Sequence, residues 1–397
     1  MKNLSIKGKI EQDAIELIGD ALFEKNSMVM TKQTLRRKVL RNHSSGIALR
    51  ILQRLQAGKL YSDIIKIGEY SIKLHPRSRN VPDILTILAN AYEARSNKEG
   101  RLQSLERLSL LLPRNSLWRS QYRDEYQLIR NMEIKALAAT QVLASYYYEI
   151  GMVNASISSF QTAASYYEIL IKFNRNHEDS NTWHTRRAHA YYNSGKLGEA
   201  RKAYENLIET RKLSQKNLQV ISYQLVLSYE KIWRREYVRA AEKNLDPSID
   251  PIVIQHLSDF ENAAVNYANR FPSSKFSVES LLAVASANRD MKKFERSSKF
   301  WQRALIASPT PQQRALAIQG IIYQQIQRKD NPKLIEGVTR FLKLERWSKL
   351  GKNLEYELMG ILSQAIRNYS DELNEKGKVL EAGQMMISLC KCQRKSF

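Results

Sequence analysis

The sequence predicts an all-α fold in which short helices form antiparallel pairs and the pairs stack side by side. Three observations predict it: a central stretch with the spacing of a helix pair, two distant segments that align without gaps, and tyrosines at helical intervals. Many of the 20 Tyr residues stand three or four positions apart. That interval is the repeat of a helix face, whereas a strand would alternate at every second residue.

The central stretch runs from Ala188 to Tyr204. Ala188 and Ala200 are small enough to leave room for a neighbouring backbone, while Tyr191 and Tyr204 fill the seam between two helices. Gly195 lies between them and supplies the left-handed residue that ends the first helix. This order predicts two antiparallel helices joined by a tight turn.

Two other segments repeat this organisation. When Pro76 is placed over Pro272, a second proline falls 37 residues later in both copies, as Pro113 and Pro309. Each copy contains a helix, a polar turn, a second helix and the terminating proline, which indicates an internal repeat. The residues that match inside the first helix are Leu85 with Leu281, Leu88 with Val284, Ala89 with Ala285, and Ala91 with Ala287.

A similar order of small, aromatic and glycine residues runs from Leu143 to Ala163. These stretches resemble tetratricopeptide (TPR) repeats, and the resemblance covers most of residues 47–390. It implies a right-handed superhelix of about seven or eight hairpins. It also implies that the first helix of each pair lines a concave groove, which binds a protein or peptide.

A narrower likeness lies in the junctions Pro76-Arg77-Ser78 and Pro272-Ser273-Ser274. They resemble bacterial envelope TPR proteins of the outer-membrane assembly lipoprotein type, which implies a role in envelope assembly. The sequence departs from that family because Met1 is followed by neither a signal peptide nor a lipid-attachable Cys. As written it therefore predicts a cytoplasmic protein. The alternative is a periplasmic or envelope-associated one, if the chain is part of a longer exported protein.

A basic helix around Thr34–Arg41 is expected to end near His43–Gly46. The whole chain is expected to divide into five segments. The segments are N-terminal amphipathic and basic helices at 1–46, an N-terminal TPR-like block at 47–114, a connecting helix at 115–132, a central TPR-like block at 133–245, and a C-terminal TPR-like block with a basic tail at 246–397.

The chain is strongly basic, with 63 Lys and Arg against 40 Asp and Glu and a formal net charge of +23. This excess could attract nucleic acid, anionic lipid or an acidic protein, or it could be a solvated basic surface without a dedicated partner. The densest stretch, from Lys25 to Ser62, contains no acidic residue. A docking patch for an anion and a solvated helix face both fit its most basic part, which is Arg36, Arg37, Lys38 and Arg41.

The sequence contains no pattern typical of an enzyme, a metal site or a cofactor site. Cys390 and Cys392 are the two cysteines, so a disulfide framework is excluded, which fits a reducing compartment. His184 and His189 are five residues apart and do not share a helix face as metal ligands would. No glycine-rich phosphate loop or nucleophile elbow is present, and no apolar run approaches the ~18 residues of a membrane span.

The function predicted is therefore a non-catalytic protein-protein interaction scaffold with a protein or peptide ligand, an acidic one being the class that the charge favours. Polar amides, tyrosines and a cation on the free face of the first helices suit an extended peptide, although each could simply be an exposed polar residue. The predicted groove residues are Asn90, Gln141, Ser145, Tyr148, His189, Tyr192 and Arg289.

The alternative is a basic helical-repeat RNA-binding protein. Such repeats read bases with a recurring pair of side chains at fixed positions. The aligned groove positions here vary, since they are Asn90, Ser145, His189 and Ser286. The sequence does not predict an oligomeric state.

Overall fold

The computed structural model describes residues 2–25, 28–37, 40, 42–174, 177–308, 310–344 and 352–394. Lys38 and Arg41 of the predicted basic patch lie outside these residues, as does Pro309. Within the described ranges the regular elements are 19 helices and no strands, which confirms the predicted all-α class. The chain separates into two compact units, Met1–Lys196 and Leu197–Phe397.

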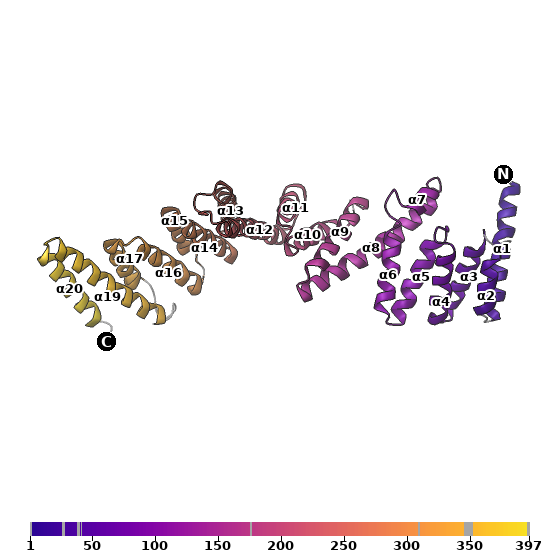
Figure 1. The fold of residues 1–397 in the computed structure, drawn as a ribbon, viewed down its shortest axis with the longest axis horizontal. Helices are drawn as coiled ribbons and strands as arrows, with labels where there is room; N and C mark the ends of the chain where they lie inside the picture. Colours follow the sequence, from indigo (N-terminus) through magenta and orange to yellow (C-terminus); the bar gives the residue numbers. More distant parts are fainter. Residues whose placement is uncertain are drawn as a thin grey trace. The chain divides into compact units, whose positions relative to one another are not determined.

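The first unit is a stack of helices in chain order (Figure 1). From α3 onward each main helix packs on the one before it, and alternate helices α3, α5 and α8 also touch. Its described helices are α1 Lys2–Glu24, α2 Met28–Arg36, α3 Ser44–Ala57, α4 Tyr61–Leu74, α5 Val81–Ala94, α6 Lys98–Ser109, α7 Leu117–Gln121, α8 Tyr126–Asn154, α9 Ile157–Phe173 and α10 Ser180–Asn193.

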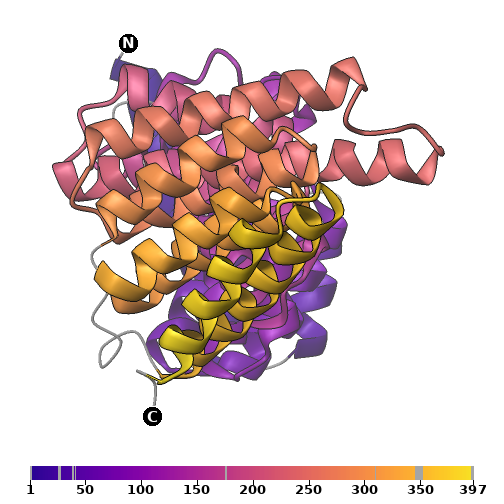
Figure 2. The ribbon, with the colours of Figure 1, turned by 90° about the vertical axis from the view of Figure 1, so that its left-hand side faces the viewer.

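The second unit follows the same rule, with each helix packed on its predecessor and α14 also touching α16. Figure 2 shows its last helices, drawn in orange and yellow, side by side. Its described helices are α11 Leu197–Thr210, α12 Gln215–Glu242, α13 Pro251–Arg270, α14 Lys275–Asp290, α15 Phe294–Ala307, α16 Pro311–Gln327, α17 Asn331–Leu344, α19 Lys352–Glu375 and α20 Val379–Arg394.

A left-handed turn residue ends the first helix of every pair. At Gly195, predicted for this role, φ is +78°, and Lys196 N–H donates to the Tyr191 carbonyl. This bond satisfies a carbonyl that the helix end leaves without a partner. Seven such turns lie between two helices of one unit, and the Gly195 turn follows α10, which fits the predicted number of hairpins. The described residues with positive φ are Lys59, Ser96, Ala155, Gly195, Asn244, Lys292, Lys329 and Gly377.

The predicted end of the basic segment is wrong. Ser44 begins helix α3 instead of ending a preceding one, and Gly46 lies inside its first turns. Ser-Ser-Gly suggests a break because these residues favour turns, but here both serines are buried in polar contacts. The Ser44 hydroxyl lies 2.5 Å from His75 Nε2, and Asn80 donates to Ser45 Oγ over 3.2 Å.

The expected five segments stay a prediction, but two observations bear on their bounds. Residues 115–132 contain the short helix α7 and the beginning of α8, which continues unbroken to Asn154. The boundary between the two units falls after Lys196, inside the segment that we expected to be one central block.

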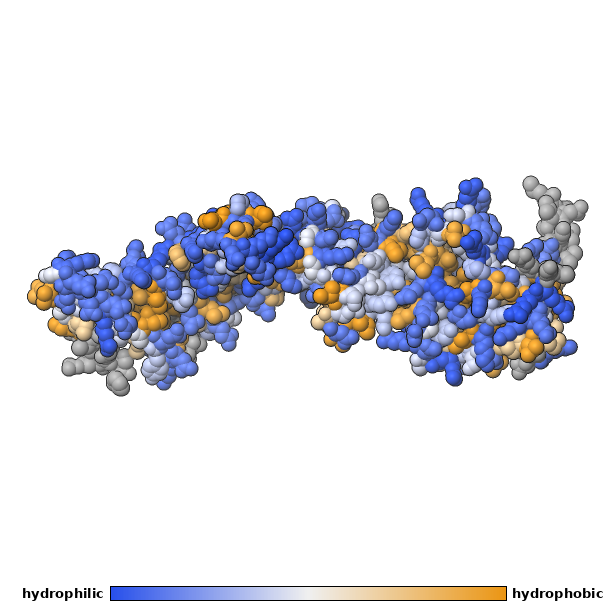
Figure 3. Space-filling view, in the orientation of Figure 1, coloured by the Kyte–Doolittle hydropathy of each residue, from blue (hydrophilic) through white to orange (hydrophobic). Residues whose placement is uncertain are grey.

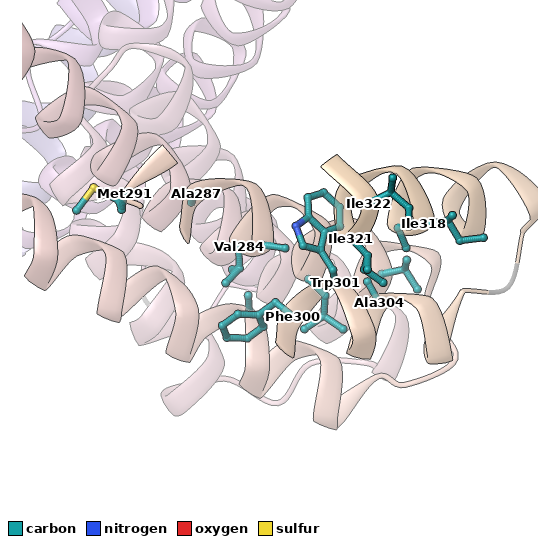
Figure 4. Packing of buried hydrophobic residues seen from close by; sticks show 14 of the residues in the cluster. Val284, Ala287, Met291, Phe300, Trp301, Ala304, Ile318, Ile321 and Ile322 are labelled. Atoms are coloured by element: carbon teal, nitrogen blue, oxygen red, sulfur yellow. The ribbon is translucent and has the colours of Figure 1, made fainter. Parts of the chain in front are cut away.

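Large aromatic residues fit against small ones in the core of the second unit. Figure 4 shows Trp301 of α15 between Val284 of α14 and Ile321 of α16. A Cβ atom added at Gly320 would lie 2.5 Å from the Trp301 ring, so glycine is what lets α16 approach α15. A buried carboxylate also joins three helices, because Glu261 of α13 accepts from Asn288 of α14 and pairs with Arg296 of α15, each over 2.6 Å.

The surface is mainly hydrophilic with separate hydrophobic patches, one of them over α13 (Figure 3). Leu245, Ile249 and Ile252, around the turn into α13, are exposed by 51%, 74% and 59%. None of the described helices combines the length and apolar character needed to cross a bilayer.

Candidate functional site

Helices α8 and α10 of the first unit bring polar and aromatic side chains together. Each is the first helix of its pair, which in chain order is α8 with α9 and α10 with α11. On α8, Gln141, Ser145 and Tyr148 follow at intervals of four and three residues, so they share one face. On α10, Arg186 and His189 are three residues apart and also share a face. Helix α9 packs against both helices, and their long side chains meet beside it.

Tyr148 is at the centre of these contacts. Its hydroxyl lies 2.5 Å from His189 Nδ1, and the Arg186 guanidinium lies 5.4 Å from the centre of its ring. Arg186 also donates from Nη1 to the Ser145 hydroxyl over 3.4 Å and to the Tyr167 hydroxyl over 3.3 Å. Tyr167 comes from α9, and its ring meets the Tyr148 ring edge-on. We call these five residues the tyrosine–arginine cluster.

Burial sets the protonation of this cluster. It raises the pKa of Tyr148, although Arg186 opposes the effect, so the hydroxyl keeps its proton at neutral pH. It lowers the pKa of His189, so the imidazole is neutral, and its Nδ1 shares a hydrogen bond with the Tyr148 hydroxyl. The hydrogen bond to Tyr167 raises the pKa of Arg186. Arg186 is therefore the one charged member of the five.

The polar face continues toward the beginning of α10. Gln141 donates from Nε2 to Asp179 over 3.4 Å, and Asp179 directly precedes α10. Beside it the His177 ring stacks on Trp183, with ring centres 4.6 Å apart. Amide, carboxylate and aromatic groups thus lie close together where α10 begins.

The predicted groove residues divide into two sets. Gln141, Ser145, Tyr148 and His189 lie together, as described above. Asn90 is exposed on α5, and Tyr192 is half-buried further along α10. Arg289 belongs to the second unit, where it donates to Asp290 over 3.1 Å and lies 5.6 Å from the centre of the Tyr323 ring. A role in binding stays a prediction for all seven.

Arg186 and Tyr167 are members that the sequence did not predict. A signal for Arg186 exists, because it stands one helical turn before His189 and so points from the same face. Tyr167 has no such signal. It lies on α9, the second helix of its pair, and its side chain is only 1% exposed.

The described part of the predicted basic patch lies at the end of α2. Arg36 is exposed, and its guanidinium lies 5.5 Å from the centre of the Tyr70 ring on α4. Lys32 approaches the same ring to 5.5 Å, and Arg37 is exposed just after the helix. The two arginines keep their charge toward solvent while Tyr70 anchors one of them.

A polar hollow of about 1010 Å³ near the N-terminus is held by internal bonds. Arg50, one of its lining residues, donates to Asp20 outside the lining over 3.0 Å, and Arg54 donates to the same carboxylate over 2.8 Å. The hydrogen bonds from Arg54 and Arg50 hold the pKa of Asp20 well below its ordinary value. These bonds fix Arg50 at one wall of the hollow.

Among the described residues no group of three or more His, Cys, Asp or Glu side chains could hold a metal ion. The hydroxyls and the guanidinium of the tyrosine–arginine cluster offer hydrogen bonds, and its rings offer flat apolar surface.

No family model matches the sequence, and no curated protein matches it either. Several solved structures are similar to it, including the following three. The C-terminal part of a TPR repeat-containing protein from Cytophaga hutchinsonii is 14% identical, with a TM-score of 0.29, over 69% of this chain and 99% of that chain. The TPR2AB domain of yeast Sti1, solved with pHSP90, is 14% identical, with a TM-score of 0.21, over 78% of this chain and 99% of that chain. The P58(IPK) TPR domain is 12% identical, with a TM-score of 0.23, over 81% of this chain and 99% of that chain.

The fold is an all-α helical repeat. Its helices form pairs around left-handed turns, and each pair packs on the one before it within a unit. In such an array no pair buries its apolar face alone, so successive first helices are brought side by side. The meeting of α8 and α10 side chains is one consequence.

Proposed function

We propose that this chain is a non-catalytic scaffold that binds a peptide or partner protein along the face shared by α8 and α10. One observation carries the proposal: side chains of two successive first helices converge at Tyr148, Arg186 and His189. In a TPR-like array that face lines the concave groove, where an extended ligand can contact several repeats.

The chemistry of the cluster suits an acidic, extended peptide. An extended backbone needs hydrogen-bond partners, which Gln141 and Ser145 can supply. Tyrosine and arginine are the residues most often found at the energetic centre of interfaces. Arg186, held in place by Tyr167, presents a charge that a carboxylate can contact without first ordering a flexible side chain.

The test is selection of a random phage-displayed peptide library on the immobilised full chain. Peptides enriched on the wild type are then measured against the variants Tyr148→Ala and Arg186→Ala. We expect each variant to weaken binding about 30-fold or more, since a central contact of this kind contributes about 2 kcal/mol. Tyr356→Ala is the matched control, because Tyr356 is 63% exposed and belongs to the second unit.

Circular dichroism and thermal unfolding must show that the variants remain folded. Tyr148→Phe adds a finer test, because it keeps the ring and removes the hydroxyl that is hydrogen-bonded to His189. Peptides that bind Tyr148→Ala and Arg186→Ala as tightly as wild type would place the binding face elsewhere and contradict the proposal.

RNA binding is a second candidate, and the net charge of +23 is the observation that favours it. The cluster itself does not add to this candidate, because it carries a single cation. The structure likewise gives no residue that would support an envelope-assembly role, because the serines of both proline–serine junctions make hydrogen bonds within the fold. The Ser274 hydroxyl accepts from Phe276 N–H at the beginning of α14, and the Ser78 carbonyl accepts from Trp118 Nε1.

A further inference from the structure

Four arginines gather where the chain leaves α6 and enters α8. The segment passes through a loop, the short helix α7 and a second turn, and so folds back over the first turns of α8. Arg114, Arg119, Arg123 and Arg130 line one hollow there, about 770 Å³ in volume. Glu133 is the only carboxylate among the lining residues, so the hollow carries an excess of positive charge.

Arg119 uses its charge to hold this segment together. Its Nη2 lies 2.5 Å from Glu133 on α8, and its Nη1 donates to the Leu112 carbonyl over 3.2 Å. The Arg119 side chain is only 19% exposed. It therefore fastens α7 to α8 and neutralises Glu133, so neither contributes to the net charge that a ligand would meet.

The other three arginines are available. Arg123 pairs with Asp124 at 3.6 Å, but the two side chains are 80% and 92% exposed, so water competes for this contact. Arg114 and Arg130 are exposed, and neither is within ion-pair distance of a carboxylate in the part of the chain that the structure describes. Exposed guanidinium groups that face one hollow without counter-charges repel one another, and an anion would relieve that repulsion.

We propose that this hollow binds a phosphate monoester carried on a side chain of a partner peptide. A phosphate offers about two negative charges and three acceptor oxygens, which suit several guanidinium groups at once. Tyr126 lines the same hollow and is 70% exposed, so it offers a flat apolar surface to the peptide around the phosphorylated residue.

A single phosphate fits these observations better than a nucleic acid strand does. The available cations face one hollow, whereas strand binding needs a track of cations along successive phosphates. The site is also separate from the tyrosine–arginine cluster. Arg130 and Tyr148 lie 18 residues apart on α8, which is about 27 Å along a helix. The proposal therefore stands or falls independently of the peptide face described above.

Phosphorus-31 NMR of the full chain tests the proposal. The probes are a short alanine-rich peptide with one phosphoserine, inorganic phosphate, and polyuridylate, each titrated separately. We expect the phosphoserine resonance to shift on binding, and the double variant Arg114→Ala/Arg130→Ala to weaken this binding about tenfold or more. Arg95→Ala is the matched control, because Arg95 is exposed at the end of α5 in the same unit and should bind as wild type.

Both replaced arginines are exposed, so the double variant should keep the wild-type thermal unfolding temperature. Rescue by Arg114→Lys/Arg130→Lys to an intermediate affinity would support recognition of charge together with guanidinium geometry. Equal binding of the phosphopeptide by the double variant and Arg95→Ala would overturn the proposal. So would inorganic phosphate that binds as tightly as the phosphopeptide, or polyuridylate that alone depends on these arginines.

Discussion

Tyrosine hydroxyls recur in this molecule as donors to glutamates on a neighbouring helix. Tyr147 donates to Glu106 over 2.8 Å, and Tyr229 donates to Glu205 over 2.5 Å. Burial, together with the hydrogen bond to Glu205, raises the pKa of Tyr229 to about 12. Burial and the glutamate raise the pKa of Tyr147 in the same direction. The rings fill the seams between helices, while each hydroxyl donates a hydrogen bond to a glutamate carboxylate on the neighbouring helix.

These pairs predict that stability falls at alkaline pH. An unfolded tyrosine loses its proton near pH 10, whereas Tyr229 in the folded chain keeps it until about pH 12. The unfolded state therefore binds fewer protons between these values, and the free energy of unfolding decreases as the pH rises through them. Urea unfolding at a series of pH values measures the decrease.

Tyr229→Phe should reduce the steepness of this decrease, because the replaced residue no longer titrates. Tyr356→Phe is the control, since Tyr356 is 63% exposed and should leave the pH profile unchanged. Absorbance at ultraviolet wavelengths gives an independent reading, as the late-titrating tyrosines should ionise only when the chain unfolds. An unchanged slope for Tyr229→Phe would contradict the assignment.

The helix period could predict much of the tyrosine–arginine cluster but not its charge. Ser145 and Tyr148, with Gln141 beside them, follow from spacing on α8, because residues three or four apart share a face, and His189 follows from the corresponding face of α10. Arg186 joins them through the reach of its side chain, which extends to Tyr167 and Ser145 on two other helices. Spacing along one helix carries no information about such contacts between helices.

At the scale of the elements, the left-handed turns show why the hairpins are hard to see in the sequence. Gly195 and Gly377 occupy two of them, and a search for glycine can find those. Lys, Ser, Ala and Asn occupy the other six, although a side chain disfavours this conformation. The beginning of α9 at Ser156 is also hard to predict from the sequence. Its size suggests a packing residue, but its hydroxyl caps α9 by accepting from Ser159 N–H over 3.3 Å.

Two opposite substitutions test these turns. Ala155, with φ of +49°, should gain stability on replacement by glycine, and Gly195, with φ of +78°, should lose it on replacement by alanine. A side chain in the left-handed region destabilises the folded chain by about 1–2 kcal/mol. Glycine avoids this cost but loses more conformational entropy on folding, which destabilises the folded chain by about 0.5–1 kcal/mol relative to alanine. We expect net changes of about +0.5 and −0.5 to −1 kcal/mol, measured by urea unfolding.

Space does not complicate the comparison at Gly195, since a Cβ atom there would have no neighbour within 4 Å. Gly360→Ala serves as the reference, because Gly360 lies inside α19 with equally open surroundings. That change should stabilise the chain by about 0.5–1 kcal/mol. Destabilisation by Ala155→Gly would mean that the residue contributes contacts that outweigh its backbone conformation.

At the scale of the whole chain, the question is whether the charge of +23 or the polar face of α8 and α10 governs binding. Salt separates the two. Contacts with six or more phosphates lose about a thousandfold or more in affinity between about 50 and 200 mM salt. A peptide bound at the tyrosine–arginine cluster meets a single cation, Arg186, so we expect its affinity to fall less than about tenfold over that range.

The comparison uses polyuridylate and a peptide selected on the wild-type chain, both measured by fluorescence anisotropy. Arg36→Gln/Arg37→Gln should lower the salt dependence of polyuridylate binding by roughly one phosphate contact for each arginine, because both arginines are exposed. The same variant should leave the peptide affinity unchanged. Arg186→Ala should instead weaken peptide binding and leave the salt dependence of polyuridylate binding unchanged. If the peptide were as sensitive to salt as polyuridylate, and as sensitive to Arg36 and Arg37, the basic surface would be the binding surface and the face between α8 and α10 would be structural.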